Sequence, residues 1–206
     1  TLGHEVVAPV RTRSAALAEL GVEQLEGGFD AVTRSVLADT AVVAHAAAAA
    51  GPDLATARAV NVAGTRGLWE GARTVGIGRF VHVSTTSVYA SDDPDVPVVD
   101  ETAPLVADDD EAAGPYARTK AAAERLLLAE EASVGLVILR PPAVLGAGAT
   151  STWGTRVPAA IRDGRGFPQP RAATFAFVHV DDLVEAIVAA AGLGEDAGPT
   201  SARGSG

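Results

Sequence analysis

Short apolar runs alternate with longer stretches of helical spacing along the chain. We expect strands where valine, isoleucine and leucine cluster between polar residues, glycines or prolines. The predicted strands are Glu5–Val10, Val22–Leu25, Ala41–Ala46, Arg79–Ser84 and Gly135–Arg140. Several of these runs, such as Leu-Val-Ile-Leu within the last, are continuous rather than alternating. Continuous apolar runs are typical of parallel strands that helices cover on both faces.

Helices are expected between and after these strands, where apolar residues recur every three or four positions. The predicted helices are Ser14–Leu20, Asp53–Val75, Tyr116–Glu131, Thr155–Arg162 and Asp181–Ala191. Strands that alternate with helices predict an α/β fold, with a Rossmann-like, doubly wound parallel sheet. We interpret residues 1–191 as this domain, and the glycine-, serine- and proline-rich residues 192–206 as a loop or linker tail.

Composition narrows the possible partners and chemistry. The 206 residues suit one domain, and the net charge of −10 makes nucleic acid and anionic membrane surfaces poor partners. The absence of cysteine excludes disulfides, thiolate zinc sites and a cysteine nucleophile. The four histidines have no metal-ligand spacing, so we predict no metal site. The longest apolar run, 41–50, is too short to span a membrane, and the expected location is cytoplasmic.

The strongest chemical signal is Tyr116 followed four residues later by Lys120. Positions i and i+4 share one face of a helix, so the phenol and the ammonium are expected side by side. Lys120 is the only lysine in the chain, and Tyr116 is one of two tyrosines. A nearby cation favours the phenolate and is expected to lower the pKa of Tyr116 towards the range useful for proton transfer.

A row of hydroxyls, Ser84-Thr85-Thr86-Ser87, ends the strand Arg79–Ser84 and runs into Val88-Tyr89. Together with Tyr-x-x-x-Lys, this segment resembles the extended short-chain dehydrogenase/reductase superfamily, the NAD(P)-dependent epimerases and dehydratases. Ala90 stands where that superfamily usually has glycine. The resemblance implies that Tyr116 exchanges a proton with the substrate and that Thr85 hydrogen-bonds the reacting oxygen. Lys120 would bind the nicotinamide ribose.

Four weaker motifs agree with the resemblance in order and spacing. Val42–Ala48 is similar to the fourth strand and small-residue turn of the superfamily, which implies cofactor contacts from Ala46 and Ala47. Leu139–Val144 resembles the sixth strand and following turn, which implies contacts from Pro141 and Pro142; Ser84 would also face the cofactor. Asn61–Thr65 and Phe177–Leu183 match motifs whose role is mostly architectural.

The resemblance also bears on which dinucleotide is bound. Relatives that use NAD usually carry an acidic residue after the second strand, whereas this chain has Arg11 and Arg13. Arginine pairs well with a 2′-phosphate, so we expect NADP to be preferred over NAD. The motif expected beside the adenine lacks its aspartate, because the chain reads Gly27-Gly28-Phe29. Base contact would therefore depend on backbone groups and Phe29.

The substrate class is less sharply indicated. Arg140-Pro141-Pro142 is more similar to the reductase branch, which includes dihydroflavonol reductases and 3β-hydroxysteroid dehydrogenases. Nucleotide-sugar enzymes usually have asparagine at the position of Ala143. We therefore expect hydride transfer between NADP(H) and a small carbonyl compound or secondary alcohol. A nucleotide-sugar epimerase or dehydratase, and a non-enzymatic NADP(H) sensor, remain the alternatives.

One expectation concerns a part that the superfamily has and this sequence does not show. The superfamily's first strand and glycine-rich turn would precede Gly3, so we expect a longer parent chain and, in this one, a sheet without its first strand. Residues 142–191 would form part of the substrate-binding lobe.

Relatives often dimerise through the helices that correspond to Asp53–Val75 and Tyr116–Glu131, so a homodimer is possible. Trp69 is either an anchor of that interface or a core residue.

Overall fold

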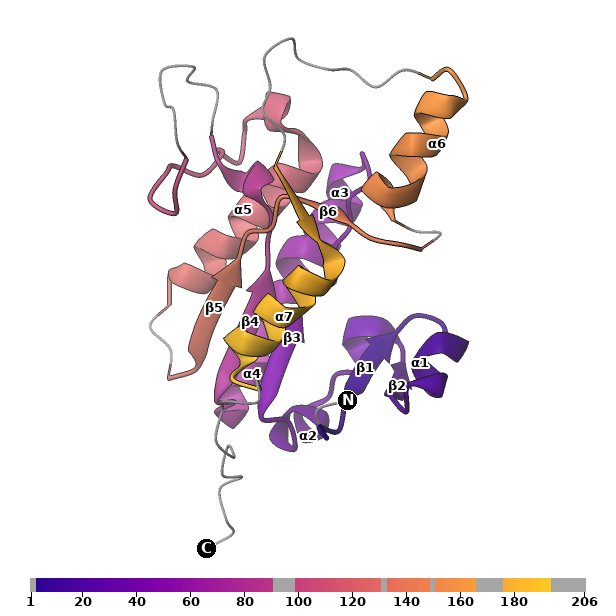
Figure 1. The fold of residues 1–206 in the computed structure, drawn as a ribbon. Helices are drawn as coiled ribbons and strands as arrows, with labels where there is room; N and C mark the ends of the chain where they lie inside the picture. Colours follow the sequence, from indigo (N-terminus) through magenta and orange to yellow (C-terminus); the bar gives the residue numbers. More distant parts are fainter. Residues whose placement is uncertain (1–2, 91–98, 131–132, 149–150, 166–175, 194–206) are drawn as a thin grey trace, which may run out of the picture.

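The computed structural model describes residues 3–90, 99–130, 133–148, 151–165 and 176–193 (Figure 1). The strands are β1 (Val7–Val10), β2 (Glu23–Glu26), β3 (Val42–His45), β4 (Arg79–Val83), β5 (Gly135–Leu139), β6 (Ala143–Leu145) and β7 (Phe177–His179). The α-helices are α1 (Ala15–Glu19), α2 (Arg34–Ala38), α3 (Leu54–Ala57), α4 (Thr65–Val75), α5 (Gly114–Leu128), α6 (Val157–Arg162) and α7 (Val180–Ala191). All five predicted strands and all five predicted helices are confirmed, with ends shifted by a few residues.

Every strand pair in the described part of the chain is parallel, as the continuous apolar runs indicated. β3, β4 and β5 form a three-stranded sheet in that order, while β1 pairs with β2 and β6 pairs with β7. The register of β3 and β4 places His45 directly beside His82. An isolated antiparallel bridge joins Tyr89 to Leu105 beyond the end of β4. The α/β architecture with parallel strands is therefore confirmed.

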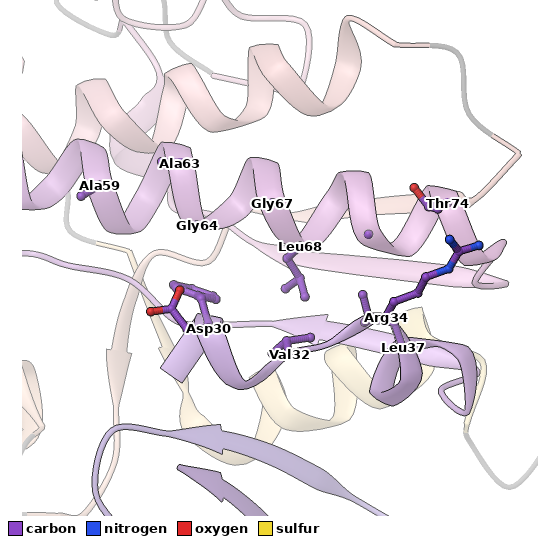
Figure 2. A pocket seen from close by; sticks show the side chains of 12 residues that line it. Asp30, Val32, Arg34, Leu37, Ala59, Ala63, Gly64, Gly67, Leu68 and Thr74 are labelled. Atoms are coloured by element: carbon purple, nitrogen blue, oxygen red, sulfur yellow. The ribbon is translucent and has the colours of Figure 1, made fainter. Parts of the chain in front are cut away.

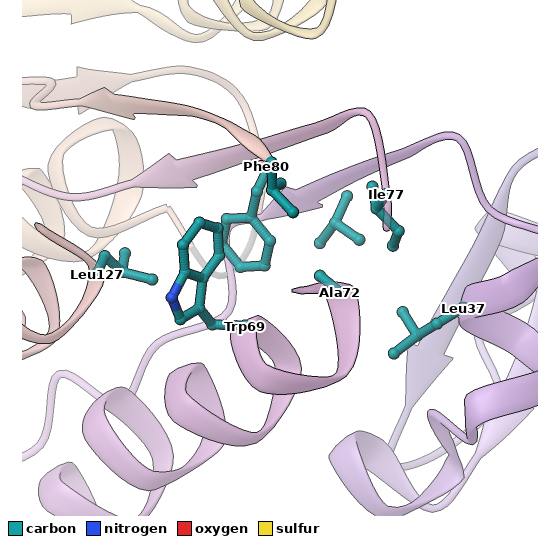
Figure 3. Close-up of a cluster of buried hydrophobic side chains, with 8 residues drawn as sticks. Leu37, Trp69, Ala72, Ile77, Phe80 and Leu127 are labelled. Carbon is teal, nitrogen blue, oxygen red and sulfur yellow. The ribbon is translucent and has the colours of Figure 1, made fainter. Parts of the chain in front are cut away.

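Helices lie on both faces of the β3-β4-β5 sheet. Figure 1 shows α7 in front of β3 and β4, with α4 and α5 behind them. The core lies between the sheet and α4, where the indole of Trp69 meets the ring of Phe80 edge-on at a centroid distance of 5.2 Å (Figure 3). The same cluster contains Leu127 of α5, Ile77, Leu37, Val43, Ala72 and Val134. Trp69 is 1% exposed, so it is a core residue rather than a surface anchor.

The predicted helix Asp53–Val75 is continuous but not uniform. The side chain of Asp53 caps its start by accepting from the backbone N–H of Thr56 at 2.7 Å. A π-helical segment, Arg58–Gly64, separates α3 from α4. Gly76 ends the helix with φ of +73°, a left-handed conformation that glycine adopts without strain. π-segments inside α-helices are frequent at functional sites, and this one carries Asn61.

The structure also differs from the sequence-based expectations. The short elements α2, β6 and β7 were not predicted. β1 and β3 belong to separate sheets, so the two edges that would flank a central strand are not paired with each other. Most of the predicted tail, 194–206, lies outside the described residues.

Candidate functional site

Three predicted residues meet at the carboxyl end of β4, where ligands bind in open α/β sheets. Thr85 follows β4 and caps a short 3₁₀ turn, with its hydroxyl oxygen 3.2 Å from the backbone nitrogen of Ser87. Helix α5 begins at Gly114 and carries Tyr116 in its first turn, where a side-chain hydrogen bond links Tyr116 to Thr85. Lys120 is one turn further along α5. The side chains of Thr85, Tyr116 and Lys120 are thus brought to one end of the sheet.

Lys120 is almost fully buried, with 1% of its surface exposed. Its Nζ donates to the backbone carbonyl oxygen of Val83 at 2.7 Å and lies 3.1 Å from Nε2 of His82. Burial lowers the pKa of Lys120 to about 8, and the negative charge of Glu124 opposes this shift. The ammonium is therefore directed at the end of β4.

The expected lowering of the Tyr116 pKa is wrong. Burial raises the pKa of this phenol, and the hydrogen bond with Thr85 only partly offsets the effect. The physical reason is that partial burial destabilises the charged phenolate by more free energy than the hydrogen bond with Thr85 recovers. The cation that was expected to lower this pKa, Nζ of Lys120, contacts Val83 O and His82 Nε2. Tyr116 is consequently a neutral phenol with a proton to donate.

A buried ion pair that sequence analysis missed supports this end of the sheet. Arg140, which follows β5, donates through Nε and Nη2 to the carboxylate of Glu124, with the shortest contact at 2.6 Å. Its Nη1 also donates to the hydroxyl of Tyr89 at 2.9 Å, and the guanidinium lies over the Tyr89 ring. The side chain of Glu124 is 0% exposed. The pair joins β5, α5 and the segment after β4, and Glu124 raises the pKa of Arg140.

Four of the predicted cofactor residues line a second feature, a cavity of about 820 Å³ between β1 and β3. Arg11, Phe29, Ala46 and Ala47 all line it. The side chain of Gln24 fixes the loop that carries Arg11, because it accepts from Ser14 N at 2.7 Å and donates to Ser14 O at 2.9 Å. The cavity therefore lies where a central strand and a dinucleotide would be expected between these two edges.

Arg13, the second arginine predicted to contact NADP, does not line this cavity. Its Nε is 2.6 Å from a carboxylate oxygen of Glu26, and both side chains are more than half exposed. Ser84 does not line the cavity either; it lies at the end of β4, where its backbone N–H donates to Leu139 O at 2.6 Å. Pro141 accepts from the backbone N–H of Thr86 at 3.1 Å, so the turn with Pro141 and Pro142 lies beside the catalytic candidates.

Asn61 connects the cavity to the catalytic helix. Its amide pairs with the backbone of Ala49 in both directions, at 2.7 and 2.9 Å, which fixes the irregular segment that contains Ala46 and Ala47. The same amide donates to the hydroxyl of Thr119 at 2.9 Å, next to Lys120 on α5. Asn61 is 1% exposed, so it acts as a buried structural link.

A smaller groove of about 590 Å³ runs along α4 (Figure 2). In Figure 2, Leu68 projects from α4 towards Val32, and Leu37 of α2 lies nearby. The ring of Phe29 packs against the backbone at Gly64, where an added Cβ would come within 2.6 Å of the ring. Phe29 thereby joins this groove to the larger cavity, which it also lines.

The residues present fit a bound dinucleotide. Small side chains, Ala46 and Ala47, allow close approach of a ligand to the backbone, and Arg11 supplies a cation at the cavity. The hydroxyl oxygen of Ser84 is buried without a hydrogen-bond partner among the described residues, beside the catalytic candidates. The described residues contain no group of three or more histidine, aspartate or glutamate side chains that could hold a metal ion. Within the same part of the chain, no helix is long and apolar enough to cross a membrane.

Comparison with known proteins gives one family. The model of the NAD dependent epimerase/dehydratase family matches residues 1–200. A 2-alkyl-3-oxoalkanoate reductase of Stenotrophomonas maltophilia (strain K279a) is 36% identical over 151 residues, which are 71% of this chain and 45% of that protein. The structure of MoeE5 in complex with UDP-glucose and NAD is similar, with a TM-score of 0.72, 27% identity and coverage of 95% of this chain and 66% of that one.

A short-chain dehydrogenase/reductase superfamily protein from Agrobacterium tumefaciens with bound NAD shares the fold, with a TM-score of 0.63 and 22% identity. The match covers 91% of this chain and 74% of that protein. The chain thus spans less than half the length of the Stenotrophomonas reductase and about two thirds of MoeE5.

Proposed function

The chain belongs to the NAD-dependent epimerase/dehydratase family, and we propose that within it the chain is the core of an NADPH-dependent reductase. Its substrate would be a small ketone or aldehyde, or the corresponding secondary alcohol in the reverse direction. The observation that carries the proposal is the placement of Thr85, Tyr116 and Lys120 together at the carboxyl end of β4, where burial raises the pKa of the Tyr116 phenol. Carbonyl reduction needs a proton donor at the substrate oxygen, and a phenol with a raised pKa is protonated at neutral pH.

Each catalytic residue then has a distinct task. Tyr116 donates its proton to the oxygen of the substrate carbonyl, and Thr85 hydrogen-bonds the same oxygen and holds the phenol. Among the described residues, Lys120 donates to Val83 and His82, and its third N–H bond would bind the nicotinamide ribose. The bound nicotinamide would supply the hydride. Ser84, Pro141 and Pro142 would contact the same cofactor.

The cavity between β1 and β3 would hold the adenosine side of the cofactor, and we infer a preference for NADPH. Arg11 lines the cavity and would pair with the 2′-phosphate, while Phe29, Ala46 and Ala47 would contact the nucleoside. Arg13 has a weaker claim, because Glu26 already pairs with it. We also infer that one more parallel strand, followed by a glycine-rich turn, completes the sheet between β1 and β3. This strand would bring a helix N-terminus to the pyrophosphate.

A reductase is favoured over a nucleotide-sugar epimerase or dehydratase on two grounds. The Stenotrophomonas relative is named as a reductase, and Ala143 replaces the asparagine expected in nucleotide-sugar enzymes. The competing candidate retains support from MoeE5, whose structure contains UDP-glucose and NAD. Net oxidation of NADPH separates the two, because an epimerase regenerates its cofactor in every cycle. A non-enzymatic sensor would bind NADPH without turnover.

The test uses the full protein that contains this chain, assayed by the loss of NADPH absorbance with a panel of small ketones and aldehydes. We expect Tyr116→Phe to lower turnover by about a hundredfold or more while NADPH still binds, because only the transferable proton is removed. Arg11→Ala should weaken NADPH much more than NADH, with Arg13→Ala as the matched control. Undiminished turnover in Tyr116→Phe would refute the catalytic assignment, and equal losses for both dinucleotides would refute the role of Arg11.

A further inference from the structure

His82 is a fully buried histidine that the catalytic scheme does not use. It lies in the middle strand, β4, with 0% of its surface exposed. Its neighbour across the sheet is His45 of β3, at a ring-centroid distance of 5.2 Å. The Nε2 atom of His82 is 3.1 Å from Nζ of Lys120. A polar ring without water around it is costly unless a partner satisfies it, so this contact needs an explanation.

The hydrogen-bond pattern fixes the proton on His82. Nζ of Lys120 is an ammonium with three donors and no acceptor, and it already donates to Val83 O at 2.7 Å. It must therefore donate to His82 as well, which makes Nε2 the acceptor and places the imidazole proton on Nδ1, an atom that is buried without a hydrogen-bond partner among the described residues. Burial first, and then the charge of Lys120 and the ring of His45, lower the pKa of His82 to about 2. The ring stays neutral throughout the physiological range.

We propose that His82 is a positioning residue for Lys120, which it holds by accepting one of the three N–H bonds of the ammonium. This inference rests on the proposed function, because it explains how the lysine of that function is kept in place. The backbone carbonyl of Val83 and the ring of His82 both belong to β4, so two donors are tied to one rigid strand. The third donor has no partner in the described part of the chain, so it can bind a ligand at the end of the strand.

The neutral ring also keeps the lysine charged. Burial lowers the pKa of Lys120, and the nearby charge that opposes this is Glu124, which Arg140 holds in its ion pair. Tyr116 lies one turn earlier on α5 and is neutral, and His45 across the sheet is neutral because burial lowers its pKa to about 4. An acceptor at Nε2 stabilises the ammonium relative to the amine, so its removal should lower the pKa of Lys120 further.

The test is a direct titration of Lys120, which is the only lysine in these 206 residues. Lysine labelled with ¹³C at Cε is incorporated into the full protein, and the Lys120 signal is identified by its loss in Lys120→Arg. Its chemical shift is then followed against pH without substrate or cofactor. His82→Phe keeps a ring of similar size but has no acceptor, and His82→Gln restores an acceptor. His45→Gln is the matched control, at the paired position of β3 and without a hydrogen bond to Lys120.

We expect His82→Phe to lower the pKa of Lys120 by about one unit or more, as the loss of a hydrogen bond to a charged group implies. His82→Gln and His45→Gln should titrate close to the unsubstituted protein. An unchanged pKa in folded His82→Phe would overturn the proposal, and so would an equal drop in all three variants. If His82→Phe does not fold, His82→Leu takes its place under the same criteria.

The titration can fail independently of the reductase assignment. If Lys120 responds to His82 as expected but no carbonyl compound supports NADPH oxidation, the positioning role stands and the proposed function falls. If turnover is found and the Lys120 titration ignores His82, only the positioning role is refuted.

Discussion

Replacing Arg140 by methionine leaves the buried carboxylate of Glu124 without the cation that it faces. Methionine retains much of the arginine's aliphatic volume but none of its donors, so the change removes three hydrogen-bond contacts, at 2.6, 3.0 and 3.1 Å. The contacts of Arg140 with the hydroxyl and ring of Tyr89 are lost as well. The charge of Lys120 still interacts with Glu124 in this variant, which limits the loss of stability.

The expected cost follows from the burial of the two partners. The side chain of Glu124 is 0% exposed, and stranding a buried charge by removing its partner costs about 3–5 kcal/mol. We therefore expect Arg140→Met to lower the free energy of unfolding by about 3 kcal/mol at pH 7. Glu124→Gln should cost less, about 1–2 kcal/mol, because Arg140 is 14% exposed and keeps Tyr89 as an acceptor. The double variant should lose clearly less than the sum.

Urea unfolding of the four proteins, followed by tryptophan fluorescence, measures these differences as a double-mutant cycle. The pH dependence gives a second signature. In Arg140→Met the stranded carboxylate gains by taking up a proton, so the loss of stability should shrink as the pH is lowered from 7 to 5. The reasoning fails if Arg140→Met loses less than about 1 kcal/mol, or if the two single losses simply add.

Two further predictions concern packing and pH. Gly64→Ala should lower the free energy of unfolding by about 1 kcal/mol or more, because the new Cβ would lie 2.6 Å from the ring of Phe29. Gly67→Ala is the control: its new Cβ would meet open space, so this change should stabilise the helix by up to about 1 kcal/mol. Urea midpoints compare the two variants, and equal effects would contradict the packing argument. Burial, and secondarily Lys120, lowers the pKa of His45 from 6.5 to about 4, so the unfolded chain binds the proton more readily. The contribution of neutral His45 to the free energy of unfolding is fully present above pH 6.5. It should fall by about 3 kcal/mol as the pH drops towards 4. Stability curves of the unsubstituted protein and His45→Gln that run parallel over this range would rule the effect out.

Elements with long, regular patterns could be predicted from the sequence, whereas several of the short elements were missed. The continuous apolar run predicted β5, and the helical spacing of apolar residues predicted α5. Both patterns match the structure because these apolar side chains pack against neighbouring elements. The five-residue helix α2 and the three-residue strands β6 and β7 carry too few positions to show a period. Their formation depends on contacts that are remote in sequence.

The candidate site shows the same division. Tyr116 and Lys120 are four residues apart, so their common helix face could be predicted from spacing. The direction of the Tyr116 pKa could not, because it is set by burial contributed by distant segments. The pairs His82–Lys120 and Arg140–Glu124 join residues 38 and 16 positions apart. Glu124 offered one unused signal, since it lies four residues after Lys120 on a helix face that is otherwise alanine-rich.

The separation of β1 and β3 has a consequence for how the molecule opens. The β1–β2 ladder shares no strand pairing with the β3-β4-β5 sheet in the described part of the chain, and side chains such as the ring of Phe29 against His45 connect the two. Backbone amides of β1 and β2 are therefore expected to exchange with solvent through a local opening that costs less than global unfolding. A strand seated between the two edges would merge them into one cooperative unit, and their exchange rates would then converge.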